Sequence, residues 1–169
     1  MIKRLLQAIK LISPVSIDEE RALEGLREHY NDDGQCVGKE NWKDGRLHGS
    51  SEAYSEAGQL RAKVTFKEGM RHGECDVYHE NGRLRCRSHY KNDIQHGLSE
   101  SYHDNGQLMG AGNYIQGKED GHWETISREG NLVYGKNYKA GELDGFQFEY
   151  DEKGHLKEIF AFKNGKKLY

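Results

Sequence analysis

Proline, cysteine and long apolar runs are scarce in this sequence of 169 residues. It has one proline and three cysteines, and hydrophobic residues make up only 34% of the chain. Mean hydropathy is −0.99, and beyond residues 1–12 no apolar run approaches the roughly 20 residues that a membrane-spanning helix needs. A compact domain of this length usually carries more apolar residues to fill its core. The composition therefore disfavours a globule and favours a sheet with one largely wet face.

What the sequence does have is a repeat with a period of 24 residues. A glycine marks each copy, and two positions, mostly aromatic, keep step with it. The glycines are Gly34, Gly58, Gly82, Gly106, Gly130 and Gly154; the two other positions hold Trp42, Phe66, Tyr90, Tyr114, Tyr138 and Phe162, and Tyr30, Tyr54, Tyr78, Tyr102, Ile126 and Tyr150. Such a period is typical of a solenoid or array. Disorder, the competing interpretation of so polar a chain, does not require regular aromatic positions.

Each copy predicts a β-hairpin. After the glycine, Leu60, Ala62, Val64 and Phe66 alternate with Arg61, Lys63 and Thr65, which indicates a strand with one covered face. The turn-rich KEGMRHG and a second short strand, ECDVYH, follow. We expect an all-β fold: an elongated antiparallel meander of six repeats over residues 29–169, with eleven strands spanning roughly 50 Å.

The segment before the repeats, residues 1–28, predicts a short helical cap. Apolar residues at Ile2, Leu5, Leu6, Ile9 and Ile12 can share one helix face, which Ser13 and Pro14 end. Ser16 with Glu19 resembles a capping box for a second helix carrying Ala22, Leu23 and Leu26. A membrane-surface helix at residues 1–12 and a signal peptide are the alternatives, and both are weakened by Gln7 and Lys10 within the apolar run.

The cysteines, Cys36, Cys75 and Cys86, are odd in number and contain no CxxC pair. Cys36 stands where the other five copies have leucine. We expect a small apolar residue in a reducing compartment, and hence a cytoplasmic protein.

Several copies resemble a known repeat. YKNDIQHG (Tyr90 to Gly97), NWKDGRLHG (Asn41 to Gly49) and TFKEGMRHG (Thr65 to Gly73) resemble the aromatic-Lys-x-Gly-x-x-x-Gly core of MORN repeats. YHENGRL (Tyr78 to Leu84) and YHDNGQL (Tyr102 to Leu108) resemble the variant found in bacterial antitoxins of the YwqK type. The resemblance covers about residues 29–169 and departs from the pattern at Ala57, Asp93 and Ile126. It implies a meander used for protein or lipid contact, with no catalytic residues.

The histidines and turn residues are interpreted as scaffold. His48, His72 and His96 share one repeat position, which becomes Asp120 and Asp144 in later copies. Equivalent residues of neighbouring hairpins lie about 10 Å apart, too far for a shared metal ion, so we expect turn chemistry. Asp93 replaces a turn glycine because Asp tolerates positive φ. No catalytic motif stands out, and we expect no enzyme activity, metal or cofactor, although a site assembled from several strands stays open.

One pattern favours a binding face. Four carboxylates spaced by 24 residues each precede a residue of the tyrosine position by two, so both share a strand face. The candidate partner-binding residues are Glu52, Tyr54, Asp76, Tyr78, Glu100, Tyr102 and Glu124. The alternative is a solvated face that keeps the sheet soluble. The C-terminal end is the most apolar part, and we expect Leu168 and Tyr169 to fold back over it or a partner to cover it.

Two hypotheses for function follow. The first is a bacterial antitoxin or immunity protein that neutralises a cognate toxin, with a basic surface, by direct binding. The second is a non-catalytic MORN-type scaffold that binds other proteins or membrane lipid, with residues 1–12 as the membrane contact. A net charge of −3 argues against nucleic-acid binding, and we expect no small-molecule substrate.

Overall fold

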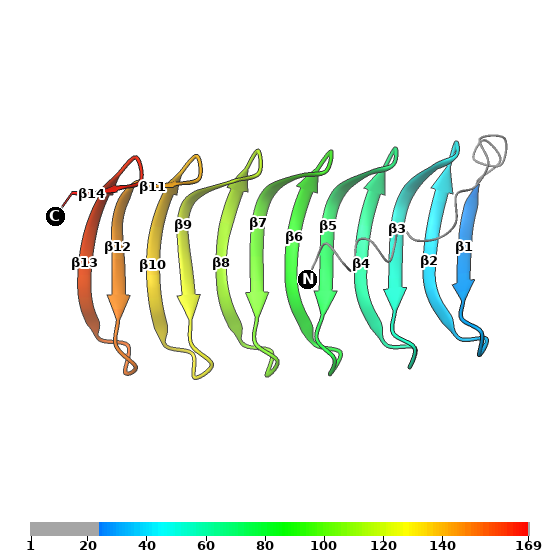
Figure 1. Cartoon of the computed structure of the whole chain (residues 1–169), viewed down its shortest axis with the longest axis horizontal. Coiled ribbons are helices and arrows are strands. Elements are labelled where there is room, and N and C mark those ends of the chain that lie inside the picture. Colours follow the sequence, from blue (N-terminus) through cyan, green and yellow to red (C-terminus); the bar gives the residue numbers. More distant parts are fainter. Residues whose placement is uncertain (1–23, 169) are drawn as a thin grey trace.

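The computed structural model describes residues 24–168, which form one antiparallel sheet in which successive strands lie side by side (Figure 1). The full-length strands are β1 (Gly25–Tyr30), β2 (Cys36–Lys43), β3 (Arg46–Tyr54), β4 (Leu60–Lys67), β5 (Met70–Tyr78), β6 (Leu84–Lys91), β7 (Ile94–Tyr102), β8 (Leu108–Ile115), β9 (Lys118–Ile126), β10 (Leu132–Lys139), β12 (Gly145–Tyr150) and β13 (Leu156–Lys163). Two short strands, β11 (Glu142–Leu143) and β14 (Lys166–Lys167), complete the sheet. The predicted all-β meander is confirmed.

The strand count differs from the expected eleven in three places. A strand, β1, precedes the first repeat glycine; the second strand of the fifth copy is divided into β11 and β12; and β14 begins a second strand in the last copy. Because β1 starts at Gly25, residues 25–28 belong to the sheet, and Leu26 lies on a strand rather than on the expected second helix. The rest of the predicted cap, residues 1–23, lies outside the described residues. Within residues 24–168 no helix is long and apolar enough to cross a membrane.

Two kinds of turn alternate along the meander. At one edge, two residues with positive φ form the turn, as Glu68 (53°) and Gly69 (82°) do, which defines the type I′ turn that suits the twist of a hairpin. Asp93 takes the place of the turn glycine at φ 66°, as expected. At the other edge, the repeat glycine lies in a loop such as residues 55–59: the N–H of Gly58, at φ 73°, donates to the Ser55 carbonyl at 2.8 Å.

A bulge beside each of these loops corrects one predicted orientation. Leu60 pairs with Tyr54, whereas Ala62 pairs with Ala53, so one extra residue lies between them. The extra residue reverses the alternation, and Leu60 joins the tyrosine row instead of sharing the face of Val64. The leucine and tyrosine positions pair in the same way in the later hairpins, as in Tyr78 with Leu84 and Tyr102 with Leu108.

The buried apolar residues around Val64 gather on one side of the sheet, here called the core face. Val64, only 1% exposed, packs with Phe66 and Cys75, and Leu47 and Tyr90 cover them. Phe66 also lies opposite Gly49, a glycine with positive φ, and Tyr90 lies opposite Gly73 in the next copy. A Cβ atom at Gly49 or Gly73 would meet Asn41 or Thr65 rather than the aromatic ring, so the positive φ, 96° and 104°, explains why glycine recurs there.

A candidate protein-binding face

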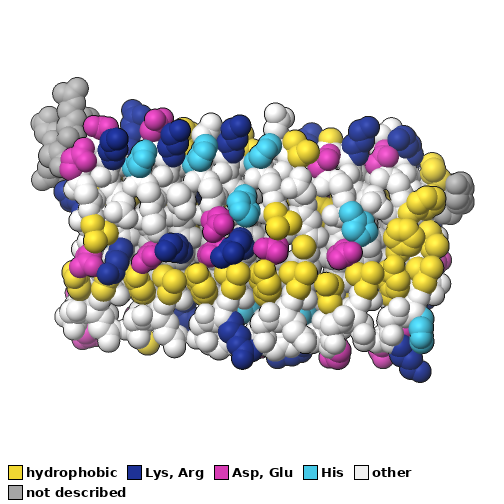
Figure 2. All heavy atoms as spheres, turned by 180° about the vertical axis from the view of Figure 1, so that it is seen from behind, with side chains coloured by type: hydrophobic (Ala, Val, Ile, Leu, Met, Phe, Trp, Pro, Cys, Tyr) yellow, Lys and Arg dark blue, Asp and Glu magenta, His cyan; other side chains and the backbone are white. Residues whose placement is uncertain are grey.

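The opposite side of the sheet, here called the charged face, carries the predicted binding residues. Cross-strand pairing runs Glu28, Lys39, Glu52, Lys63, Asp76, Arg87, Glu100, Ala111 and Glu124, one residue from each successive strand from β1 to β9. Figure 2 shows this row of acidic and basic side chains above an apolar row. The structure thus brings the four predicted carboxylates together, and Lys63 and Arg87 lie between the first three of them.

Ion pairs neutralise the first half of the row. Lys39 Nζ lies 2.8 Å from Glu28 Oε1, and Lys63 Nζ lies 3.1 Å from Glu52 Oε1. All four side chains are partly exposed, so each pair contributes little stability. Their arrangement nevertheless leaves Glu52 with a cation of its own chain beside it.

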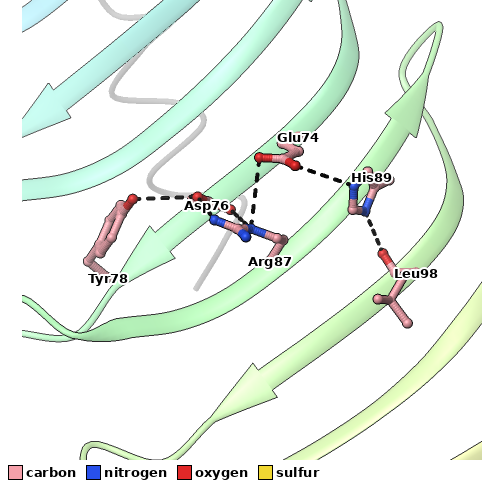
Figure 3. Close-up of polar contacts among 6 residues, drawn as sticks. All are labelled: Glu74, Asp76, Tyr78, Arg87, His89 and Leu98. Carbon is pink, nitrogen blue, oxygen red and sulfur yellow. Dashed lines mark hydrogen bonds and ion pairs between the residues drawn. The ribbon is translucent and has the colours of Figure 1, made fainter. Parts of the chain in front are cut away.

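Asp76 and Arg87 form an ion pair with two hydrogen bonds (Figure 3). Arg87 Nε donates to Asp76 Oδ1 at 2.8 Å and its Nη2 donates to Oδ2 at 2.7 Å. Asp76 is only 6% exposed, and the hydrogen bonds from Arg87, with the attraction of the two charges, raise the pKa of that guanidinium. Glu74 adds a longer contact of 3.9 Å to Arg87 and lies 3.7 Å from His89. Asp76 therefore serves the sheet itself, and little of its side chain is exposed to a partner.

The tyrosine hydroxyls bind the same carboxylates. Tyr54 Oη donates to Glu52 Oε2 at 2.5 Å, and this bond is the largest cause that raises the pKa of Tyr54 to about 12. The same bond, with Lys63, lowers the pKa of Glu52. Tyr78 Oη donates to Asp76 at 3.5 Å. The hydroxyls of Tyr54 and Tyr78 thus already have hydrogen-bond partners within the sheet. The tyrosine rings form the apolar row together with the paired leucines.

The second half of the row lacks its bases. Ala111 and Gly135 occupy the positions that Lys39, Lys63 and Arg87 hold in earlier copies. Among the described residues, Glu100 has no ion pair, and Glu124 has only His122, whose Nε2 lies 3.3 Å from Glu124 Oε1. Past Gly135 the row becomes apolar with Phe148 and Ile159. To predict which residues pair across the strands, one must know where the bulges lie, and the sequence carries no direct signal for them.

The histidines lie in the scaffold, although not in the turns themselves. His48, His72 and His96 lie in strands, each directly before a bulge glycine of positive φ. The equivalent Asp120 accepts a hydrogen bond from the Ala140 N–H in the neighbouring turn, at 3.1 Å. The position therefore links one hairpin to the next turn.

His79 and His103 link the opposite edge. Their Nε2 atoms donate to the carbonyls of Tyr102 and Ile126, at 2.9 and 3.0 Å, in the next copy. Asn81 adds a parallel bond from Nδ2 to the Asp104 carbonyl at 2.7 Å. Within residues 24–168, no three His, Cys, Asp or Glu side chains gather in a way that could hold a metal ion.

Comparison with known proteins also detects a repeat in this chain. The family profile described as "MORN repeat variant" matches residues 47–68, 71–92 and 95–116. No curated protein matches the chain. Among solved structures, the chain is similar to one from the crystal structure of the GtfA/B complex bound to UDP and GlcNAc, at 15% identity and a TM-score of 0.29. The match covers 68% of this chain and only 22% of that one. Between β3 and β8, three tandem segments of this protein thus match the MORN repeat variant profile.

Proposed function

We propose that the protein is a non-catalytic repeat scaffold that binds another protein through the charged face. The observation that carries the proposal is the pair of rows on that face: tyrosines and leucines in one, carboxylates and bases in the other, across nine neighbouring strands (Figure 2). Tyrosine rings supply rigid contact area, and charges beside them steer and orient a partner.

The specific partner that we favour is a toxin with a basic surface, which the protein would neutralise in the cytoplasm by covering it. The motifs YHENGRL and YHDNGQL, which resemble those of bacterial antitoxins, support this choice. Both motifs lie in loops, where His79 and His103 link neighbouring copies. They therefore bear on the construction of the sheet, and the choice of a toxin rests on the resemblance alone.

The test is co-purification of the tagged full-length protein from its own host, followed by mass spectrometry. One stoichiometric protein, encoded next to this one and inactive while bound, is the expected result. Recovery of membrane components, or of no stoichiometric protein, would contradict the proposal.

Charge-reversal variants that test the charged face should leave the sheet folded. Charge reversal at Asp76 would place a cation beside Arg87 in a nearly closed site and destabilise the sheet. Glu100→Lys with Glu124→Lys changes charges that have no lysine or arginine partner within residues 24–168. We expect this double variant to fold and to weaken partner binding by about tenfold or more.

A further inference from the structure

The alternating row of the charged face is interrupted at Ala111, between Glu100 and Glu124. We infer that this gap receives a lysine or arginine side chain of the partner protein, while apolar side chains of the same partner segment cover Phe146, Phe148 and Ile159. The inference rests on the proposed function and narrows it to one part of the face and to one partner chemistry, a cationic and apolar segment.

Earlier copies of the repeat show what the gap accommodates. The residues 72, 48 and 24 positions before Ala111 are Lys39, Lys63 and Arg87. Each places its cation against the carboxylate of the preceding strand, at 2.8 Å for Lys39, 3.1 Å for Lys63 and 2.7 Å for Arg87. The backbone pairing is the same at Ala111, which lies opposite Glu100 on one side and Glu124 on the other. Only the long cationic side chain is missing.

The two carboxylates beside the gap are available. Arg87, the cross-strand neighbour of Glu100, directs both of its short bonds to Asp76 instead. Glu124 has a side chain that is 45% exposed and contacts only the imidazole of His122 among the ion-pairing groups of residues 24–168. A partner ammonium or guanidinium would therefore meet acceptors that no lysine or arginine of the described chain already occupies.

The apolar part of the surface lies on the same face, toward the C-terminal end. Phe146 is 56% exposed and Ile159 is 48% exposed, and the rings of Phe146 and Phe148 are 6.3 Å apart. Figure 2 shows this broad hydrophobic area just beyond the interrupted row. Three strand spacings separate Ala111 from Phe148, roughly 14 Å. An extended segment that crosses the strands would span that distance with about four residues.

Charge complementarity selects this occupant over two others. A second copy of the chain would bring the same carboxylates to the interface if it docked by the same patch, and like charges would then oppose each other. A purely apolar partner would leave Glu100 and Glu124 desolvated without a cation. A segment that combines a cation with apolar residues satisfies both parts of the surface.

The test uses the full-length protein and a displayed library of random peptides about 12 residues long as the probe. The key variant, Ala111→Arg, fills the gap from within the chain. Gln59→Arg, on an exposed loop, adds the same charge elsewhere and serves as the control. We expect selected peptides to pair Lys or Arg with an aliphatic or aromatic residue about four positions away. Ala111→Arg should weaken their binding by about tenfold or more, and Gln59→Arg by about twofold or less.

Four outcomes would overturn the inference: selected peptides without a cation, affinities that Ala111→Arg leaves unchanged, self-association through this patch, or occupation of the patch by residues 1–12 of the same chain. A co-purified partner whose affinity is unchanged in Ala111→Arg would sink this inference and leave the proposed function standing. Failure to find any protein partner would instead remove the proposed function. Thermal unfolding of Ala111→Arg, expected at or above the wild-type temperature, keeps loss of binding separate from loss of fold.

Discussion

Strands β2 to β6 and strands β8 to β13 are built from the same hairpin repeat and differ in their side chains. On the core face, Val64 and Cys75 fill one part of the first region. The equivalent positions 48 residues later hold Gly112 and Trp123. The tryptophan covers the glycine and meets Tyr114 edge to face, with ring centroids 5.1 Å apart. Where the first region has two side chains of moderate size, the second therefore has a glycine and a tryptophan.

The charged face shows the same divergence with a different consequence. In the first region each carboxylate has a base beside it, whereas in the second Ala111 and Gly135 replace the bases and Phe148 and Ile159 follow. Meanwhile the turns barely change: Glu68 has φ 53° and Ala140 has φ 53° at the same turn position. The turns therefore stay the same from copy to copy, and the copies differ at strand positions.

The largest effect is expected from Gly112→Ala. A Cβ atom at residue 112 would lie 1.9 Å from Trp123, so the indole must leave its place over the strand. We expect the free energy of unfolding to fall by about 3 kcal/mol through overpacking and loss of the tryptophan contacts. Chemical denaturation followed by tryptophan fluorescence measures this loss.

Gly38→Ala is the matched control in the first region. Its Cβ would meet nothing closer than 3.6 Å, and its φ is not positive. We expect stability to change by less than about 1 kcal/mol. Equal losses in the two variants would show that the two regions are packed alike, against the comparison above.

The next effect compares two carboxylates of the same row. Asp76→Ala leaves Arg87 without the carboxylate that accepts both of its short bonds. Because Asp76 is nearly closed to solvent while the Arg87 side chain is 36% exposed, we expect a loss of about 2 kcal/mol, below the full cost of a broken buried pair. Glu100→Ala, one copy later, removes no ion pair of the part of the chain that the structure describes and should cost about 0.5 kcal/mol or less. Denaturant midpoints for the two variants should differ clearly, and a loss in Glu100→Ala as large as in Asp76→Ala would contradict the interrupted row.

Sequence reasoning succeeded where one residue type has one physical role. Repeat glycines with positive φ, Asp93 in a turn, and the alternation of Ala62, Val64 and Phe66 all follow from local rules. Its error at Leu60 arose at a bulge, because one extra residue between β3 and β4 moves Leu60 to the other face. A separate bulge lies between β4 and β5, where Lys63 pairs with Asp76. The 24-residue spacing of the carboxylates predicted that they share one face, but the bases beside them were not predicted, since cross-strand register depends on those bulges.

A smaller and equal effect is expected in both regions from the loop histidines. His79→Ala and His103→Ala each remove one hydrogen bond, of 2.9 and 3.0 Å, to a carbonyl of the next copy. We expect each to lower the free energy of unfolding by about 1 kcal/mol. If loops carry the fold in every copy, urea titrations of the two variants should nearly coincide. A loss confined to one of them would show that the loops also differ between regions.

The smallest effect is expected on the pKa values of Tyr54 and Tyr102, which a titration compares. The hydrogen bond to Glu52 is the first cause that raises the pKa of Tyr54 to about 12, whereas burial is the first cause that raises the pKa of Tyr102, ahead of Glu100. A raised phenol pKa contributes stability that is complete below pH ~10, the pKa of an unfolded tyrosine, and is lost as pH rises through about 12. Glu52→Gln should therefore return the pKa of Tyr54 toward its ordinary value and remove this alkaline loss. Glu100→Gln should move the pKa of Tyr102 less, because burial remains.

Tyrosine ring NMR signals, assigned with Tyr54→Phe and Tyr102→Phe, give both pKa values. If both moved equally, the carboxylates would hold their tyrosines with equal strength, and the difference between the two halves of the row would be confined to its bases.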